Sequence, residues 1–210
     1  MRGLFVVLEG PEGAGKSTLA RALSALLAAE AGEDRVVLTR EPGGTPTSDA
    51  VREVLLDTRF DMAPLTEFLL YSASRAQHVE QVIRPALDAG KAVICDRFSG
   101  SSVAYQGAGR GVDAAFVREL NARVSQGCIP DLTILVDIDP ELGLQRIASR
   151  GRPDRLESAD LAFHRRVAES FREQAAAGDW FVLDGTRAQA EVLGDASSML
   201  LERARSWLRG

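Results

Sequence analysis

Eight residues near the amino terminus have the types and spacing of a loop that binds phosphate. They read Gly-Pro-Glu-Gly-Ala-Gly-Lys-Ser over residues 10–17 and fit the pattern G-x-x-x-x-G-K-[ST]. In such a loop the backbone N–H groups surround nucleotide phosphates, the lysine reaches two of them and the hydroxyl binds Mg²⁺. The expected nucleotide-binding residues are therefore Gly10, Glu12, Gly13, Ala14, Gly15, Lys16, Ser17 and Thr18.

The residues on either side of this motif indicate that it joins a strand to a helix. An apolar run at 4–8 precedes it, and leucines follow it at helical spacing from Leu19 to Leu27. A helix that begins at the motif places its partial positive charge at the phosphate site. The chain has 23 arginines and only one lysine besides Lys16, so a lysine here favours a phosphate contact over a coincidental Gly-rich turn.

Length and composition limit what the protein can be. The 210 residues predict one domain spanning 1–210, and the net charge of −5 argues against broad binding to nucleic acid. Cys95 and Cys128 lack the spacing of metal ligands, and reduced thiols are expected rather than a disulfide. No apolar run has the length of a signal peptide or a membrane span, so we expect a cytoplasmic protein.

Short apolar runs alternate with helical patterns along the chain. Ligands of sheets built in this way bind at the carboxyl ends of the strands. The alternation predicts an α/β fold of the P-loop NTPase type, a five-stranded parallel sheet covered by helices on both faces. Strands are expected at 4–8, 35–38, 92–95, 132–136 and 180–183, and helices at 17–30, 46–57, 65–88, 113–126, 140–150, 159–177 and 188–208.

Charged residues follow the second and third expected strands. Asp96 could hold Mg²⁺ through water beside the Ser17 hydroxyl, or it could cap the next turn. Arg97 offers a planar guanidinium suited to phosphate, or it could pair with Asp96 or Glu9. Arg40 lies in a polar turn with two glycines after the second strand, so we expect cations to gather at this edge of the sheet.

Two further segments could form a pocket for a nucleoside. Tyr71 and Arg75 are four residues apart in one expected helix, so a ring and a guanidinium share a face and could bind a flat base. Because an aromatic at helical spacing is more often part of the core, the pair alone is a weak signal. Ser102, Tyr105 and Gln106 lie in a small, polar run after the third strand and could line the same pocket.

Four arginines occur within ten residues, at 146, 150, 152 and 155. Glycine and proline interrupt them, so we expect the preceding helix to end in a mobile loop, at about 146–158. A run of charges is often only a solvated surface. After the fourth strand, however, such a loop could close as a lid over phosphates in transfer and exclude water.

These segments together resemble the thymidylate kinases of the nucleoside-monophosphate kinase family, in the bacterial type with lid arginines. The resemblance covers the phosphate loop, Thr-Arg-Glu-Pro-Gly-Gly at 39–44, and Tyr71 with Arg75. It continues with Asp96-Arg97, Ala-Tyr-Gln-Gly at 104–107 and Asp-Arg-Leu-Glu at 154–157. The phosphate loop alone is shared by many NTPases, whereas this combination in this order is far more specific.

The resemblance implies phosphoryl transfer from MgATP to dTMP, which gives dTDP and ADP in dTTP biosynthesis. It implies that Lys16 and the loop amides hold the ATP phosphates, with Ser17 and Asp96 at Mg²⁺. It also implies a homodimer that works on small molecules and binds neither nucleic acid nor a membrane.

The resemblance further assigns residues to dTMP. Arg97, assisted by Arg40, would hold its phosphate, and Tyr71 takes a stacking position that is usually phenylalanine in the family. Tyr105 would lie against the deoxyribose and disfavour a 2′-hydroxyl. Arg75 and Ser102 would bind the thymine edge, while Glu12 would reach the 3′-hydroxyl. The implied substrate-binding residues are Glu12, Arg40, Tyr71, Arg75, Arg97, Ser102, Tyr105 and Gln106.

The cation for the transition state is expected in the lid. Some relatives place a catalytic arginine in the phosphate loop, but that position here is acidic or small. Arg150 is the first candidate, with Arg146, Arg152 and Arg155 as alternatives. The expected catalytic residues are Lys16, Asp96, Arg97, Arg150 and Arg155.

Two other functions are compatible with the phosphate loop alone. The nearest is another kinase of this fold that acts on AMP, GMP or shikimate. A GTPase-like switch would need an Asn-Lys-x-Asp guanine signature, and neither Lys16 nor Lys91 lies in such a sequence. The combination of motifs favours dTMP as the acceptor.

Overall fold

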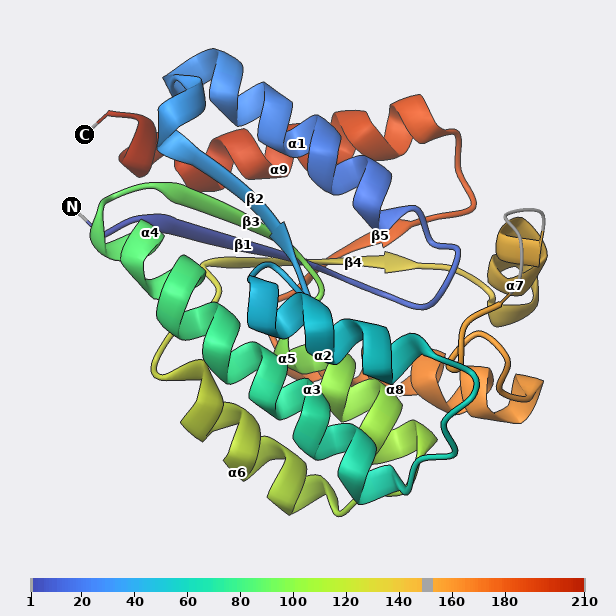
Figure 1. Cartoon of the computed structure of the whole chain (residues 1–210). Coiled ribbons are helices and arrows are strands. Elements are labelled where there is room, and N and C mark those ends of the chain that lie inside the picture. The colour runs from blue at the N-terminus through green and yellow to red at the C-terminus, as the bar shows by residue number, and fades with distance from the viewer. Residues whose placement is uncertain (1, 149–152, 210) are drawn as a thin grey trace.

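The computed structural model describes residues 2–148 and 153–209, which form an α/β fold around one parallel sheet (Figure 1). The strands hydrogen-bond in the order β2-β3-β1-β4-β5, and every pairing is parallel. The five expected strands are confirmed. They are β1 (Leu4–Glu9), β2 (Val36–Arg40), β3 (Ala92–Asp96), β4 (Leu132–Asp137) and β5 (Phe181–Asp184).

Helices cover both faces of the sheet. Figure 1 shows α1 and α9 on one face and α3, α4, α6 and α8 on the other. In the described part of the chain, no helix is both long and apolar enough to cross a membrane. The helices are α1 (Lys16–Ala31), α2 (Pro46–Leu56), α3 (Pro64–His78), α4 (Arg84–Asp88), α5 (Ser99–Ser102), α6 (Ala114–Ser125), α7 (Pro140–Ala148), α8 (Leu161–Ala177) and α9 (Gln189–Leu208), with a short 3-10 turn η1 (Glu33–Arg35).

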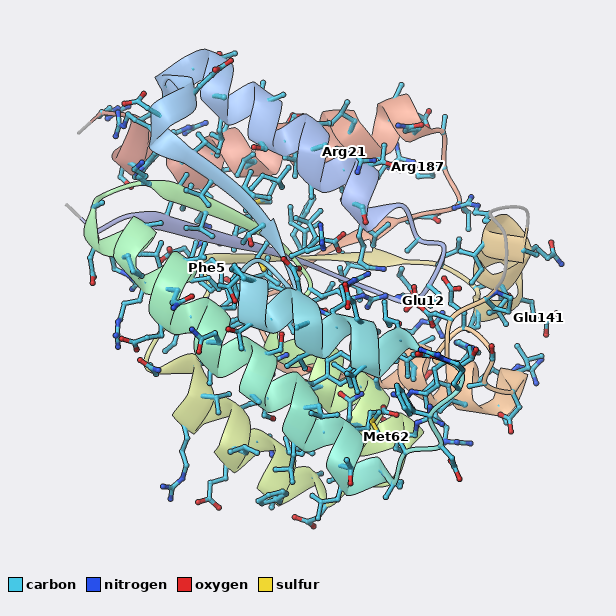
Figure 2. The ribbon with its side chains drawn as sticks, in the orientation of Figure 1. Phe5, Glu12, Arg21, Met62, Glu141 and Arg187 are labelled. Atoms are coloured by element: carbon cyan, nitrogen blue, oxygen red, sulfur yellow. The ribbon has the colours of Figure 1, made fainter. Side chains whose placement is uncertain are left out.

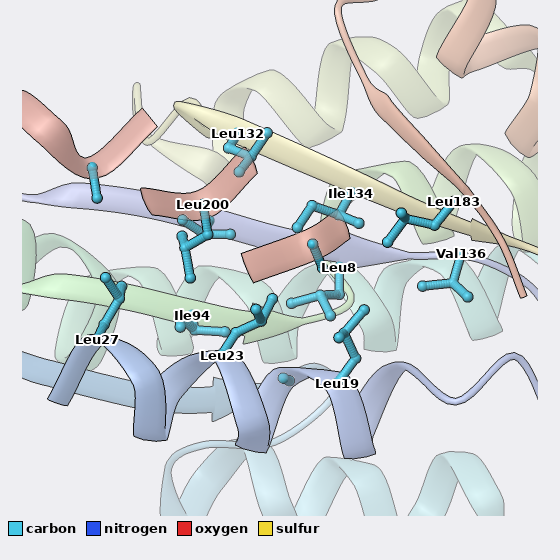
Figure 3. Packing of buried hydrophobic residues seen from close by; sticks show 14 of the residues in the cluster. Leu8, Leu19, Leu23, Leu27, Ile94, Leu132, Ile134, Val136, Leu183 and Leu200 are labelled. Atoms are coloured by element: carbon cyan, nitrogen blue, oxygen red, sulfur yellow. The ribbon is translucent and has the colours of Figure 1, made fainter. Parts of the chain in front are cut away.

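The central strand β1 is buried along its whole length, as its unbroken apolar run predicts. Its side chains alternate between the two faces. Leu8 packs toward α1 and α9, where Figure 3 shows it among Leu23, Ile94 and Leu200. Phe5 packs on the other face against a separate cluster, which includes the free, buried thiols of Cys95 and Cys128. The expectation of reduced cysteines is confirmed.

The helix expected at 65–88 is one rod with an irregular middle. A π-helical segment, η2 (Val79–Ile83), separates α3 from α4. Pro85 lies in the first turn of α4, where it cannot donate the backbone hydrogen bond of a continuous α-helix. The wider π turn precedes this missing donor and lets the rod continue past it.

The helix formed by α5 and the π-helical η3 (Val103–Gly109) is absent from the sequence prediction. Serine and glycine are poor helix formers, so no local signal marks its start. A distant carboxylate provides the cap instead: Glu9 Oε1 accepts from the backbone N–H groups of Phe98 and Ser101, each at 3.0 Å. A buried carboxyl group at the helix start satisfies the free amides there, although burial raises the pKa of Glu9.

The phosphate loop touches the first turn of α7 through glycine backbones. A Cβ on Gly13, where φ is +72°, would lie 2.2 Å from the carbonyl oxygen of Gly143. A Cβ on Gly143 would lie 2.3 Å from the carbonyl oxygen of Glu12. The loop and the helix can therefore be this close only because neither residue has a side chain.

We predict that Gly143→Ala destabilises the protein, although alanine normally favours a helix. The new methyl group must push the phosphate loop away, at a cost of roughly 1–3 kcal/mol in the free energy of unfolding. Gly194→Ala is the matched control, because Gly194 lies in α9 with no atom within 4 Å of its Cβ position. It should gain about 0.5–1 kcal/mol. Urea unfolding measures both, and a stabilised Gly143→Ala would contradict the contact.

Candidate active site

A cavity of about 300 Å³ lies at the carboxyl ends of β1, β2 and β3. It brings together side chains from strand ends, helices and the phosphate loop that are far apart in the sequence. All the expected substrate-binding residues line it: Glu12, Arg40, Tyr71, Arg75, Arg97, Ser102, Tyr105 and Gln106. Five loop-side residues, Gly13, Gly15, Lys16, Ser17 and Thr18, line it as well.

A second cavity of about 320 Å³ lies on the other side of the phosphate loop. Gly13, Gly15 and Thr18 line both cavities, so the loop is their common wall. Arg187 lines the second cavity, and Figure 2 shows it near the start of α1. Glu12 lies on the other side, toward α2 and α8 (Figure 2). Of the expected nucleotide-binding residues, Ala14 lines the second cavity and Gly10 lines neither.

Lys16 is buried at the start of α1. Its Nζ donates to the carbonyl oxygen of Pro11 at 2.7 Å. Burial lowers the pKa of Lys16 to about 8, helped by the Arg97 charge and opposed by Glu12. The nearby negative charges therefore do not offset the burial of the ammonium in the protein alone. This is the property expected of a group that binds phosphate anions.

Ser17 and Asp96 meet at the edge of the same cavity. The Ser17 hydroxyl donates to Asp96 Oδ2, while Oδ1 of that carboxylate is buried and has no hydrogen-bond partner among the described residues. A hydroxyl and a carboxylate with an unused oxygen fit the hard, oxygen-preferring Mg²⁺. The described residues hold no cluster of three or more His, Cys, Asp or Glu that could bind a metal alone.

Arg97 follows β3 with a left-handed backbone, at φ 71°. This conformation sends its guanidinium back toward the phosphate loop, where Nη1 donates to the carbonyl oxygen of Gly10 at 2.9 Å. Nη2 donates to Glu12 Oε1 at 2.7 Å. Of the two ion pairs considered from the sequence, Asp96 and Glu9, the structure has neither, because Glu12 takes the guanidinium instead.

Glu12 is fixed by Arg97 and Tyr105. The Tyr105 hydroxyl donates to Glu12 Oε1 at 3.0 Å, and the Arg97 guanidinium lies 5.0 Å from the centre of the Tyr105 ring. Burial raises the pKa of Glu12, but the positive charges of Arg97 and Lys16 outweigh it and leave the pKa at about 2. Glu12 is therefore an anion that accepts hydrogen bonds throughout the neutral range.

Arg75 is fully buried, with four hydrogen bonds that aim its guanidinium. Nε donates to Glu41 at 2.7 Å, and Nη1 donates to Asn121 at 2.7 Å. Nη2 donates to the carbonyl oxygen of Phe98 at 3.0 Å and to Ser102 Oγ at 3.1 Å. Since a guanidinium has five N–H groups, one remains for a ligand in the cavity.

Tyr71 and Arg40 differ in how firmly they are held. Tyr71 is 9% exposed on the wall of the cavity. Arg40 has a side chain that is 57% exposed and makes one long contact of 3.4 Å with Asp49. Arg40 can therefore swing toward an anion, whereas Tyr71 offers a surface that is already in place.

The arginines expected in the lid lie in different places. Arg146 lines the second cavity, where Nη1 donates to the carbonyl oxygen of Gly185 at 3.0 Å. Arg155 lines neither cavity; it contacts Glu67 and the carbonyl oxygen of Leu55. Arg150 and Arg152 lie outside the described residues.

Three charged residues in or beside the first cavity are among those that the sequence prediction missed. Arg52 in α2 lines the first cavity and donates from Nη1 to the carbonyl oxygen of Pro42 at 2.9 Å. Glu41 aims Arg75, and Glu67 binds Gln106. Glu67 lies one helical turn before Tyr71, so extending the Tyr71–Arg75 spacing backward could have found it. The sequence carries no comparable signal for Arg52.

Comparisons with known proteins agree on one family. A family model described as thymidylate kinase matches residues 8–195. A thymidylate kinase of Deinococcus radiodurans is 54% identical over 204 residues, which cover 96% of this chain and 98% of that protein. One of Halothermothrix orenii is 48% identical over 197 residues, 91% of this chain and 93% of that protein. A crystal structure of thymidylate kinase from Ehrlichia chaffeensis matches with a TM-score of 0.79 at 31% identity, and covers 95% of this chain and 99% of that one.

We predict that binding of ATP takes up a proton at alkaline pH, because phosphate contact requires charged Lys16. With a pKa of about 8 in the free protein, Lys16 should contribute about 0.1 proton of uptake at pH 7 and about 0.9 at pH 9. Calorimetry in buffers of different ionisation enthalpy measures this uptake. No increase between these pH values would refute the depressed pKa.

The lowered pKa of Lys16 also makes the free energy of unfolding depend on pH. The pKa of Lys16 is 10.5 in its unperturbed state and about 8 when folded, so between these values the unfolded chain binds more protons. The contribution of Lys16 to the free energy of unfolding therefore rises as the pH rises through this window.

Proposed function

The chain belongs to the thymidylate kinase family, whose members transfer the γ-phosphoryl group of ATP to dTMP, and we propose that its two cavities hold the two substrates. Its reaction is that of the family and yields dTDP and ADP. The observation that carries the proposal is the shared wall: residues of the phosphate loop line both cavities. The donor would lie in the second cavity and the acceptor in the first, with the transferring phosphoryl group at the loop between them.

On the donor side, the loop amides and Lys16 hold the ATP phosphates. The second cavity then receives adenine, and the planar Arg146 guanidinium, fixed by the carbonyl oxygen of Gly185, provides a flat surface for it. Ser17 and Asp96 hold Mg²⁺, which when bound neutralises charge on the donor phosphates. Oδ1 of Asp96 supports this assignment, because it is buried and the described residues give it no hydrogen-bond partner.

On the acceptor side, Arg97 and the exposed Arg40 hold the dTMP phosphate. Tyr71 stacks on thymine, and Arg75 offers its remaining N–H to the thymine edge, together with Ser102. This assignment is supported by the cavity that all of these residues line. The planar ring and fixed donors suit a flat base with carbonyl groups.

The deoxyribose lies between Tyr105 and Glu12 in this arrangement. Glu12, an anion that only accepts hydrogen bonds, accepts one from the 3′-hydroxyl. Tyr105 presses against the sugar and leaves no room for a 2′-hydroxyl. Gln106 closes the same wall.

Catalysis consists of positioning and charge neutralisation. The attacking oxygen of dTMP belongs to a phosphate that is already an anion, so no general base is required. We assign Lys16, Asp96 and Arg97 to this task, with Arg150 as the lid cation that neutralises charge in the transition state. Arg155, whose guanidinium contacts Glu67, could act directly only after leaving that carboxylate.

Assembly and location follow the family pattern in this proposal. A single kinase domain pairs into a homodimer through α3 and α6, which carry exposed apolar side chains at Leu65, Leu69 and Phe116. Phe116 of α6 contacts Phe68 of α3 with ring centres 5.8 Å apart, so these helices present one surface. The enzyme acts in the cytoplasm, an assignment supported by its free thiols.

We predict that Tyr105→Ala weakens the preference for deoxyribose, whereas Tyr105→Phe retains it. The alanine variant removes the ring that excludes a 2′-hydroxyl; the phenylalanine variant removes only the hydroxyl that binds Glu12. The measurement is kcat/KM for dTMP against ribothymidine monophosphate, with AMP and GMP as further acceptors. An unchanged ratio in Tyr105→Ala argues against the sugar contact, and a better rate with AMP or GMP argues against dTMP as the acceptor.

We predict that Arg150→Ala lowers kcat by on the order of 10³-fold, with much less effect on the affinity for dTMP. A cation that acts in the transition state affects the rate more than ground-state binding. Arg165→Ala is the control, because Arg165 is an exposed arginine that contacts Glu141 on the surface. Similar kcat values for the two variants would exclude Arg150 and direct attention to the other lid arginines.

A further inference from the structure

Glu67 carries a buried carboxylate beside the acceptor cavity, although it does not line that cavity. Its exposed fraction is 0%. Oε1 accepts from Gln106 Nε2 at 2.8 Å, and Oε2 accepts from Arg155 Nη1 and, at 3.2 Å, from Arg110 Nε. Glu67 lies one turn before Tyr71 on α3, so it is on the same helix face as Tyr71 and Arg75, which line the acceptor cavity.

The two closest partners of this carboxylate belong to separate walls of the cavity. Gln106, on η3, lines the cavity itself. Arg155 does not, but its neighbours Asp154 and Leu156 do. One buried carboxylate is thus bonded to η3 on one side and to the segment 154–157 on the other.

The segment 154–157 is shaped by its own hydrogen bonds and attached by Arg155. Asp154 Oδ1 accepts from the backbone N–H groups of Leu156 at 2.8 Å and Glu157 at 2.9 Å, which close a tight turn. These bonds are local, and contacts to other elements fix the turn to the rest of the protein. Leu156 is buried in one apolar cluster with Tyr105 and Phe163. Arg155 attaches the turn through Glu67 on α3 and through the carbonyl oxygen of Leu55, 2.9 Å from Nε, at the end of α2.

The chemistry of the contact requires a carboxylate. All three neighbours of Glu67 donate hydrogen bonds, and an ionised carboxylate is the side chain that only accepts. In Glu67→Gln, the amide NH₂ can face Gln106 only if the Gln106 amide turns its oxygen toward it, and at Arg155 it meets a group that only donates. The substitution also leaves the guanidinium of Arg155, whose side chain is 11% exposed, without its counter-charge, which is the costly way to break such an ion pair.

We propose that Glu67 is a positioning residue for the acceptor, because it sets the distance between η3 and the segment 154–157 on either side of the cavity. Arg155 is its partner in this role. The donor cavity contains neither Gln106 nor any residue of 154–157. The proposal rests on the assignment of the first cavity to dTMP. It requires that substitution of Glu67 changes the KM for dTMP and not the KM for ATP.

The test is a double-mutant cycle of Glu67→Gln and Arg155→Met in the full chain, with KM measured separately for dTMP and ATP. Each single variant should raise the KM for dTMP by at least about tenfold, the loss expected for a charge-assisted hydrogen bond, while the KM for ATP stays within about twofold. The double variant should be no worse than the more affected single variant, because both break the same contact. Arg155→Lys should lie between wild type and Arg155→Met, since an ammonium can meet the carboxylate but makes fewer contacts.

Arg110→Met is the matched control, because Arg110 caps the end of η3 through its backbone, and its side chain donates to the same carboxylate without lining the cavity. The variant removes that cation and leaves the bonds of Glu67 to Gln106 and Arg155 in place. It should leave the KM for dTMP within about twofold. The proposal is overturned by a parallel rise in both KM values, by additive effects, by an unchanged Arg155→Met or by an equal rise in Arg110→Met. If Glu67→Gln does not fold, the Arg155 variants and the Arg110 control decide the question. Failure of the wild-type protein to phosphorylate dTMP would instead refute the proposed function.

Discussion

The contact between Arg97 and Glu12 joins the two halves of the site. Arg97 comes from the end of β3 with a left-handed backbone, and its guanidinium bonds both Glu12 and the carbonyl oxygen of Gly10 in the phosphate loop. The same guanidinium lies over Tyr105, so η3 is aligned with the loop. The side chains of Arg97 and Glu12 are only 16% and 20% exposed, so removal of either partner leaves the other charge poorly compensated. This charged contact therefore joins the phosphate loop to the end of β3.

Buried carboxylates organise the rest of this edge of the sheet. Glu9 caps the helix that begins after Phe98, Glu41 aims Arg75, and Glu67 links Gln106 to Arg155. In each case an acidic group from one element meets donors from elements distant in sequence. A carboxyl group buried inside a protein requires such hydrogen-bond partners, so each of the three fixes a relative position that apolar packing alone would leave loose.

The sequence predicts the strands and the residues that line the cavity better than it predicts which side chains bond to each other. Apolar runs place all five strands, and all the acceptor residues inferred from the motifs line one cavity. Periodicity, however, contains only local information. The partner of Arg97 is 85 positions away and that of Arg155 is 88 positions away, and neither separation leaves a pattern in the chain. The helix after Phe98 was missed for the same reason, because its cap is a carboxylate 89 positions earlier.

Two glycines of the loop between the two cavities lie against the backbone of other segments: Gly10 against Val136 and Gly13 against Gly143. Gly13 meets the backbone of Gly143 at a distance that excludes any side chain, so the loop is pressed between α7 and the acceptor residues. A displacement of the loop from the α7 side would carry Glu12 with it, and Glu12 is bonded to Arg97 and Tyr105. A displacement of the loop would therefore alter the walls of both cavities. A thin, doubly supported wall of this kind suits phosphoryl transfer, where the rate depends on keeping the two reacting oxygens in line.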